Sequence, residues 1–472
     1  MIVTDAFDDD ASSIRKQPLT RPEPAQHTFG DETRSLNGPA YNSSPVVPPS
    51  PSGPPPAYPG YQSINHPSSS RLPRRDSPPL RQYSPHIVTM KDLEWPSNDT
   101  AYERLWCASS QDWEVIDEGG HGAFLGQSSA VLKSPFVLPI NSDLDLFLVA
   151  NTGISGHLLV EEDASLTDHA ELSVRVDYYE GAKGWKSLLG SEICMLSMKE
   201  IGLGVSLTSN SASNRLLDTL SFSVVLSLPP HKSSPFYIPE FIIRMPHFSI
   251  ETAALSKSYN FGTFLVLTLD GEININSVAG RDVQLITTNG PVRGSLTASR
   301  TLNIVTSNAR TNVDVKLLNS RDFGPTDLTL QTNNFPLIAK ITLESTADTK
   351  RGGNFRVFAK TTDARLDLAF VSTPLDSALR MVAQANNGPA LIQLDAAYEG
   401  EVELRMNQDG VIDVRNMTRL DPSGRGRDRK MVWDRRTSRK VAKGVVEWKP
   451  SMRIGALGSV SVTSDEEIHI RV

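Results

Sequence analysis

A short pattern that returns at a fixed spacing runs through the second half of the chain. In three consecutive segments an apolar, strand-like run ends in a threonine, and Thr268, Thr287 and Thr306 are each 19 residues apart. A fourth copy places Thr332 after 26 residues, which is one period plus a short insertion at Asn319 to Gly324. A fixed period of this size indicates one small supersecondary unit per repeat, which can bury its apolar face only against its neighbours. The sequence therefore predicts a stack of coils.

Each repeat has room for two short strands and two turns. At a rise of about 3.3 Å per residue, equivalent strands on adjacent coils would stack about 4.8 Å apart. Asn, Asp or Gly recurs at the bend, because these residues tolerate positive φ and bond the local backbone. We expect four of these side chains to align as a polar ladder, namely Asp270, Asn289, Asn308 and Asn334. Two interpretations of the ladder stay open: structural turn residues, or a row of amides and carboxylates that binds a sugar or a cation.

Strand-like texture extends well beyond the clear repeats. Ser142 to Leu148 and Glu171 to Val176 alternate polar with apolar residues, which is typical of strands buried on one side. The predicted fold class is all-β, a β-solenoid or β-helix-like stack of strands over residues 136–472, with its clearest repeats at 261–343.

Two shorter stretches are harder to interpret. Residues 91–135 are predicted to be a linker with a short helix at Asp99 to Cys107, capped by Asp99 or Thr100. The stretch from Lys186 to Ile201 fits either a helix or a pair of strands.

Residues 1–90 form a compositionally different tail. Pro, Ser, Gly, Asn and charged residues dominate it, and it holds more than half of the prolines of the chain but none of its tryptophans. Such a stretch buries too little apolar surface to offset about 1–2 kcal/mol of backbone entropy per ordered residue. We expect this Pro/Ser-rich tail to be disordered.

One motif in the tail matches a known type of peptide ligand. Pro55, Pro56 and Tyr58 form a Pro-Pro-x-Tyr sequence, which WW domains bind. Proline pre-forms the polyproline II helix and so lowers the ordering cost, while the tyrosine fills a separate pocket. The motif predicts a WW-domain partner, and the alternative is an inert spacer.

A basic segment interrupts an otherwise acidic chain, whose net charge is -7. Its cationic residues are Arg425, Arg427, Arg429, Lys430, Arg435, Arg436, Arg439 and Lys440. We interpret residues 415–445 as a hairpin inserted between two strands, with solvated charges and with Trp433 folded back on the core. The alternative is contact with phosphates of an anionic membrane or of nucleic acid, with Trp433 entering the interface or stacking on a base. No specific nucleic acid is predicted.

The sequence also carries expectations about compartment. Only two cysteines occur, Cys107 and Cys194, far apart and outside any C-x-x-C spacing, so we expect no disulfide framework and a reducing compartment. The first residues are acidic and lead into no apolar core, unlike a secretory signal. No run of 18 apolar residues predicts a spanning helix. The predicted location is cytoplasmic.

The search for catalytic chemistry is largely negative. The sequence has no Gly-x-Ser-x-Gly elbow, no phosphate loop, no His-Glu-x-x-His and no complete Gly-x-Gly-x-x-Gly. Asp143 and Asp145 are predicted to lie on an exposed strand face, and His121 in a loop without a partner. We therefore expect no enzyme and assign no catalytic, cofactor or metal residues.

The alternating strand, Thr-x-Asn-Gly turn, alternating strand pattern resembles putative-adhesin β-solenoid domains. The layout, a proline-rich tail joined to such a domain, resembles fungal proteins that carry a domain of unknown function. The resemblance covers roughly Phe136 to Val472 and is strongest at Phe261 to Leu343. It implies a β-helical, non-enzymatic fold and carries over no catalytic residue.

Three functions are consistent with these features. The first is a non-enzymatic intracellular scaffold or interaction protein, with a rigid solenoid body and a partner-recruiting tail. The second is a glycan-binding or polysaccharide-active β-helix protein, and the third is a peripheral membrane protein that uses the basic hairpin.

Overall fold

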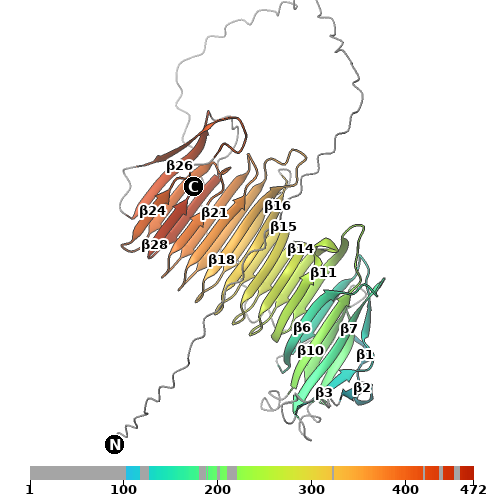
Figure 1. Ribbon diagram of the computed structural model, residues 1–472. Coiled ribbons are helices and arrows are strands. Elements are labelled where there is room, and N and C mark those ends of the chain that lie inside the picture. Colours follow the sequence, from blue (N-terminus) through green and yellow to red (C-terminus); the bar gives the residue numbers. More distant parts are fainter. Residues whose placement is uncertain are drawn as a thin grey trace, which may run out of the picture. The chain divides into compact units, whose positions relative to one another are not determined.

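A computed structural model gives the architecture of the chain (Figure 1). It describes residues 102–116, 127–151, 153–179, 188, 190–198, 202–209, 220–320, 324–417, 420–434, 440–450 and 458–472. Within this part the regular structure is strand, apart from two short 3-10 turns, η2 (Ser110–Asp112) and η4 (Leu255–Lys257), and the single helical residue Leu188. The all-β prediction is confirmed.

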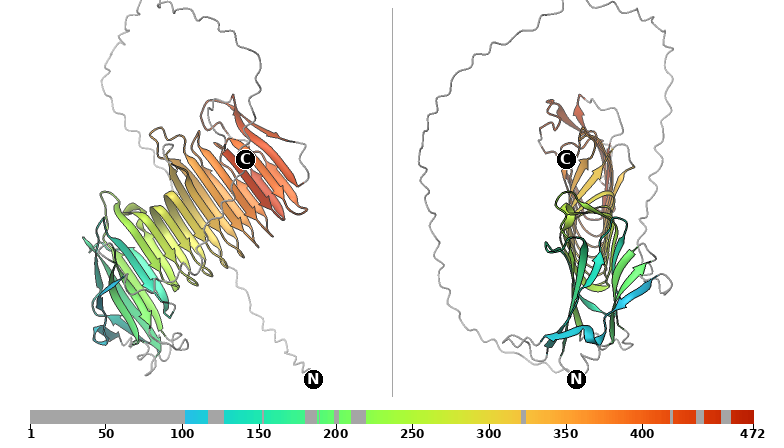
Figure 2. Two further views of the ribbon diagram at one scale, coloured as in Figure 1. Left: turned by 180° about the vertical axis from the view of Figure 1, so that it is seen from behind. Right: turned by 90° about the vertical axis from the view of Figure 1, so that its right-hand side faces the viewer.

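The strands form two facing layers that run along the stack (Figure 2). In spatial order, the first sheet contains β1 (Glu103–Cys107), β8 (Ser191–Met198), β9 (Gly202–Ser209), β5 (Asp145–Ala150), β11 (Phe236–Arg244), β13 (Tyr259–Leu267), the second halves of β14 (Ile273–Ile286) and β15 (Val292–Val305), β17 (Thr326–Gln331), β19 (Asn354–Thr361), β21 (Ala378–Ala385), β27 (Gly458–Ser464), β23 (Gly400–Met406), β26 (Val441–Lys449) and β25 (Asp428–Trp433).

The second sheet has a matching order. It contains β2 (Trp113–Ile116), β3 (Gln127–Leu132), with β4 (Phe136–Pro139) alongside it on β7 (His169–Tyr179), then β10 (Leu220–Leu228), β6 (Ser155–Glu162), β12 (His247–Ala254), the first halves of β14 and β15, β16 (Thr311–Asn319), β18 (Leu337–Ser345), β20 (Leu366–Ser372), β22 (Ala390–Gln393), β28 (Glu467–Arg471) and β24 (Val411–Arg415).

Each coil places one strand in each sheet, so the repeat unit seen in the sequence is one turn of the stack. From β13 to β19, each strand of the first sheet ends at a threonine turn, and the chain then crosses to the second sheet. β14 and β15 then bend from the second sheet into the first without a loop, with irregular register at the bend. All of these neighbouring coils pair in parallel, as equivalent strands of stacked repeats must.

The core lies between the two sheets as continuous rows of apolar side chains. Phe264, Val283 and Leu302 are in register on successive coils, and each is at most 1% exposed. Alternation at period two sends every second side chain of a strand inward, and the parallel register stacks these side chains from coil to coil. Burial is therefore achieved between coils, as the period predicts.

The order of the strands departs from the order of the sequence at both ends of the stack. The first coil, β5 with β6, lies between the later strands β9 and β10 on one side and β11 and β12 on the other. The last coil, β27 with β28, lies between β21 and β22 on one side and the earlier strands β23 and β24 on the other. Both coils therefore have further strands between them and the end of the stack, and antiparallel pairs occur among these strands, namely β8 with β9, β10 with β7 and β23 with β26.

Two local predictions need correction. Residues 103–107 form strand β1 rather than the end of a helix, because they pair antiparallel with β8. Within the predicted linker 91–135, β2 and β3 are also strands of the second sheet. In the uncertain stretch from Lys186 to Ile201, residues 191–198 form the strand β8, whereas the described residue Leu188 is helical.

Among the described residues, no helix is long and apolar enough to cross a membrane.

Candidate functional site

A polar ladder runs along the turns at one edge of the stack. Asn289 Nδ2 donates to Asp270 Oδ1 at 2.6 Å, and Asn308 Nδ2 donates to Asn289 Oδ1 at 2.8 Å. Asn334 continues the series by donating to Asn308 at 2.6 Å. The predicted alignment of these four side chains on adjacent coils is confirmed. The pKa of Asp270 is lowered, because Asn289 donates to its carboxylate and His247 adds a second hydrogen bond.

The ladder extends further than the sequence suggests. Asn387 donates to Asp363 at 2.8 Å, and Asn407 donates to Asp465 at 2.6 Å, both across neighbouring coils. Asn387 and Asp465 lie in segments whose sequence weakly echoes the repeat, whereas Asp363 and Asn407 were not identified from the sequence because their spacings are irregular. Asn289 and Asn308 each use one amide donor and the amide oxygen in hydrogen bonds within the ladder. This favours the interpretation of the ladder as structural turn residues. Binding of a sugar or a cation along the ladder stays a prediction.

A second, buried ladder explains why threonine recurs. The hydroxyl of Thr268, which is 1% exposed, donates to the carbonyl oxygens of Pro246 at 2.9 Å and Phe248 at 3.0 Å in the preceding coil. Thr332 does the same to Ala309 at 3.0 Å. A buried carbonyl without a partner is costly, so a threonine at this position stabilises each coil–coil contact.

A glycine follows the ladder residues Asp270 and Asn289, and the expected reason was a positive φ at the bend. Gly271 and Gly290 do not have positive φ. A Cβ on Gly271 would instead come within 1.6 Å of Phe248 O, and one on Gly290 within 1.7 Å of Gly271 O. Close approach of adjacent coils, rather than a left-handed backbone, therefore requires glycine here.

The predicted basic hairpin is present. β25 pairs antiparallel with β26, and residues 435–439, which include Arg435, Arg436 and Arg439, lie outside the described residues. On β25, Met431 and Trp433 pack against the main core, whereas Lys430 is exposed. Trp433 folds back on the core as expected, so the hairpin closes the end of the first sheet.

Arg427 does not belong to the basic surface. Its side chain is only 9% exposed, and its guanidinium bonds to Asp421 at 3.0 Å and Glu399 at 3.5 Å and lies over the Trp448 ring. Arg429 also lies over this ring, 5.6 Å from its centroid. The face of the Trp448 ring and, for Arg427, the two carboxylates hold these guanidinium groups against the body. Among the described cationic residues of the basic segment, only Arg425, Lys430 and Lys440 are therefore exposed.

A tight loop holds Asp421 against Arg427. The loop turns at Gly424 and Gly426, whose φ values of 69° and 67° favour glycine. The Asp421 carboxylate accepts hydrogen bonds from the backbone N–H groups of Ser423 and Arg427. The pKa of Asp421 lies far below its usual range, mainly because the Arg427 side chain donates to the carboxylate. This network fixes the loop beside Trp448 of β26.

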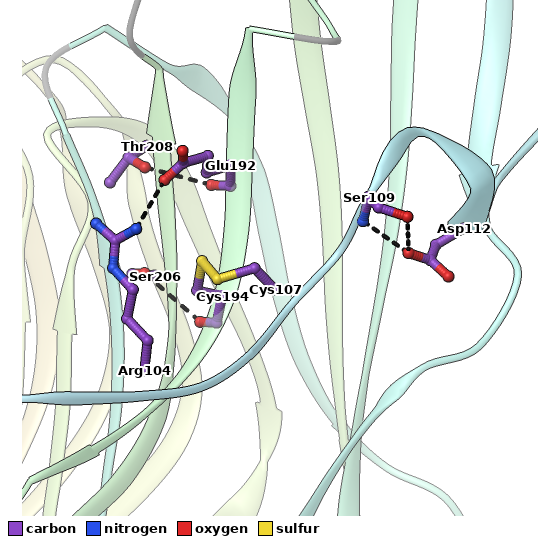
Figure 3. Close-up of a disulfide and its surroundings, with 8 residues drawn as sticks. All are labelled: Arg104, Cys107, Ser109, Asp112, Glu192, Cys194, Ser206 and Thr208. Atoms are coloured by element: carbon purple, nitrogen blue, oxygen red, sulfur yellow. Dashed lines mark hydrogen bonds and ion pairs between the residues drawn. A yellow bond between two sulfur atoms is a disulfide. The ribbon is translucent and has the colours of Figure 1, made fainter.

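The two cysteines form a disulfide, contrary to expectation. Cys107 on β1 and Cys194 on β8 are register partners, with Cα atoms 4.0 Å apart and an S–S bond of 2.05 Å (Figure 3). They are 87 residues apart in sequence, so only the antiparallel pairing of β1 with β8 brings them together. No local sequence signal reveals this pairing.

The disulfide anchors the first strand beside a small apolar cluster. Phe147, Cys194 and Leu196 are buried in this cluster, and Tyr102 packs edge-on to Phe147 with ring centroids 5.7 Å apart. Burial raises the pKa of Tyr102. Beyond the cluster, the Trp106 ring packs at a tilt of 57° against Phe136 of β4, with ring centroids 4.8 Å apart, and this contact links the edges of the two sheets.

The remaining site predictions have mixed outcomes. Asp145 is buried rather than exposed, and burial together with Glu240 raises its pKa. His121 and the motif Pro55, Pro56 and Tyr58 lie outside the described residues. Within the described part of the chain, no group of three or more His, Cys, Asp or Glu side chains could hold a metal ion.

Comparison with known proteins adds little. No family model and no curated protein matches the chain. Among solved structures, the chain is similar to a putative cell adhesion protein from Clostridium sporogenes, with 9% identity and a TM-score of 0.15 over 72% of this chain and 98% of that one. It is also similar to a putative lipid binding protein from Parabacteroides distasonis, with 10% identity and a TM-score of 0.21 over 71% and 96%. Scores of this size do not establish a common fold.

Proposed function

We propose that the protein is a non-enzymatic scaffold, in which a rigid stack of coils carries a tail that recruits partner proteins. The observation that carries the proposal is the internally bonded body. Its threonines and its ladder amides bond to neighbouring coils, and antiparallel pairs lie at both ends of the first sheet and at the first end of the second sheet. The side chains of such a body are committed to holding its shape, which leaves recruitment to segments outside it.

The tail joins the body at a well-anchored point. Residue 102 and strand β1 are held by the disulfide and by the packing of Tyr102 on Phe147. A peptide ligand upstream of this point is tethered to the scaffold without depending on the folding of the tail. We infer that Pro55, Pro56 and Tyr58 recruit a WW-domain protein in this way, as the sequence predicts.

A pull-down with the full chain tests the recruitment. Replacing Tyr58→Ala should weaken capture of WW-domain proteins roughly tenfold, because the aromatic ring that fills the binding pocket is lost. Tyr61→Ala, three residues further along the same tail, is the matched control and should capture the same partners as the wild type. Identical partners for Tyr58→Ala and the wild type would exclude the WW contact.

The alternative functions have less support. A membrane role for the hairpin would draw on its cations and on Trp433, but Arg427 and Trp433 face the body. A glycan-binding role would draw on the ladder, whose amides already bond to one another. Liposome sedimentation and a glycan array test these functions, and binding in either assay would revive the corresponding one.

A cytoplasmic location belongs to the same proposal and faces a direct test. Disulfides are typical of oxidising compartments, so the Cys107–Cys194 bond weighs against this location. Alkylation of thiols in intact cells, followed by mass spectrometry, distinguishes the two cases. Two alkylated cysteines would support a cytoplasmic scaffold, whereas an intact bond would place the protein in an oxidising compartment.

A further inference from the structure

Strand β1 is the outermost strand of the first sheet at the first end of the stack. Among the described strands it pairs with β8 alone, and the register of this pairing shifts between Arg104 and Trp106. Residues 103–106 are exposed and Cys107 is half-buried, so the strand has no fully buried side chain. A strand that buries so little apolar surface gains little free energy from packing.

The outermost strand at the other end of the same sheet is anchored differently. On β25 every second residue is half-buried, and Met431 and Trp433 pack against the main core. On β1 the Trp106 ring contacts Phe136, but Trp106 is still 40% exposed. The apolar contacts of β1 with the body are therefore weaker than those of β25.

The polar side-chain contact of β1 is weak as well. Arg104 bonds to Glu192 of β8 at 3.2 Å, but the two side chains are 64% and 39% exposed (Figure 3). Exposed ion pairs contribute little to stability. The covalent bond between Cys107 and Cys194 is therefore the strongest link between the side chains of β1 and the body.

Opening of β1 would stop at the next strand. It would uncover Leu196 of β8 and Phe147, which are 7% and 3% exposed, because Arg104 is the register partner of Leu196 and Tyr102 packs on Phe147. β8 itself stays paired with β9, and β9 with β5. Detachment of the edge strand is thus a local event that leaves the stack intact.

The disulfide can be approached by a thiol from the side of Cys107, which is half-buried, whereas Cys194 is 2% exposed. A thiolate of a dithiol attacks Sγ of Cys107, and Sγ of Cys194 leaves and takes up a proton. The second thiol of the reductant then resolves the mixed disulfide. Two electrons and two protons pass to the cysteine pair, which ends as two thiols, and the dithiol ends as a disulfide.

We propose that the Cys107–Cys194 bond is a redox latch: a dithiol reductant breaks the bond, β1 then detaches from β8, and the rest of the stack stays folded. With the bond intact, residue 104 lies three residues from a covalent attachment and cannot leave the sheet. The chain upstream of residue 102 joins the body through β1, so the latch decides whether the base of the tail is fixed. The inference goes beyond the proposed scaffold function and does not depend on the WW contact at Tyr58.

Limited trypsin digestion of the full chain tests the latch at the Arg104–Leu105 bond, which lies inside β1. The chain is reduced with dithiothreitol and desalted anaerobically, so that trypsin keeps its own disulfides. Cleavage after Arg104 should be at least about tenfold faster in the reduced than in the oxidised chain, because a paired strand must open before it is cut. Cleavage after Arg293, an exposed residue of β15, reports on the stack and should stay slow in both.

A variant without the bond provides a second arm. Cys107→Ala/Cys194→Ala should be cut after Arg104 as fast as the reduced wild type, and dithiothreitol should not change its rate. If this variant does not fold, the wild type alone decides, since it needs no substitution. Equal cleavage of the oxidised and reduced wild type after Arg104 would overturn the proposal.

Two further results would also overturn it. Faster cleavage after Arg293 on reduction would mean that the bond holds the whole stack rather than one strand. A bond that survives the reductant, shown by a chain without free thiols, would mean that Cys107 cannot be reached.

Discussion

The middle of the stack and its two ends are built on different principles. From β13 to β18 each coil repeats the contacts of the one before it, with rows of apolar side chains, a buried threonine and a ladder amide. At the ends the contacts occur once: the Cys107–Cys194 bond at one end and the Arg427–Asp421 pair at the other. Stability is shared among many equivalent contacts in the middle, whereas each end depends on a few.

The comparison is tested most strongly by truncating the same residue type in both regions. Ile304 is fully buried in the middle of the stack. Ile304→Ala should lower the free energy of unfolding by about 2–5 kcal/mol, because a cavity forms between tightly packed coils. Ile412→Ala in β24, where the side chain is only partly buried, should cost about 1–2 kcal/mol. Denaturant unfolding followed by circular dichroism measures both.

Thr297→Ala, a half-buried position on the second sheet, is the control and should stay within about 0.5 kcal/mol of the wild type. Equal losses for Ile304→Ala and Ile412→Ala would contradict the distinction between middle and ends.

The buried threonine ladder should give a smaller effect. Thr268→Val keeps the shape of the side chain but removes the hydroxyl that donates to the carbonyl oxygens of Pro246 and Phe248. The Pro246 oxygen still accepts from the backbone N–H of Leu269 at 2.6 Å, so the substitution should lower the free energy of unfolding by only about 1 kcal/mol. Thr329→Val, on the outer face of β17, should be nearly neutral. If Thr268→Val is as stable as the wild type in thermal unfolding, the hydroxyl does not hold the coils together.

The difference between middle and ends also explains what the sequence reveals. The middle was predicted correctly, because a fixed spacing of Thr268, Thr287 and Thr306 is visible in a single sequence and each copy has the same environment. The strand character of residues 103–107 was missed, because β1 is stabilised by β8, almost ninety residues later. Local propensity carries no information about such pairing.

The candidate sites follow the same division. The ladder from Asp270 to Asn334 was predicted, since its members share a position in the repeat. The inward turn of Arg427 was not, because a run of cations says nothing about a tryptophan and two carboxylates that fold beneath it. The Cys107–Cys194 bond was missed for the same reason.

The smallest expected effect concerns the pH dependence of the last coil. His469 on β28 lies between Glu467, at 2.9 Å, and Asp413 of the outermost strand β24, at 3.3 Å. Hydrogen bonds to these carboxylates, Glu467 first, raise the pKa of His469 above its ordinary value of 6.5. A histidine with a raised pKa stabilises the folded state fully below its ordinary pKa, and the contribution is lost as the pH rises through the raised value. The ion pair between protonated His469 and Asp413 should therefore stabilise the contact of β24 with β28 by less than about 1 kcal/mol, because both side chains are partly exposed.

Hydrogen exchange of β28 amides tests this pH dependence. From about pH 5 to about pH 9, and after correction for intrinsic rates, protection should fall with pH in the wild type and follow a flatter profile in His469→Gln. Parallel profiles would mean that the ion pairs of His469 do not contribute to closing this end of the stack.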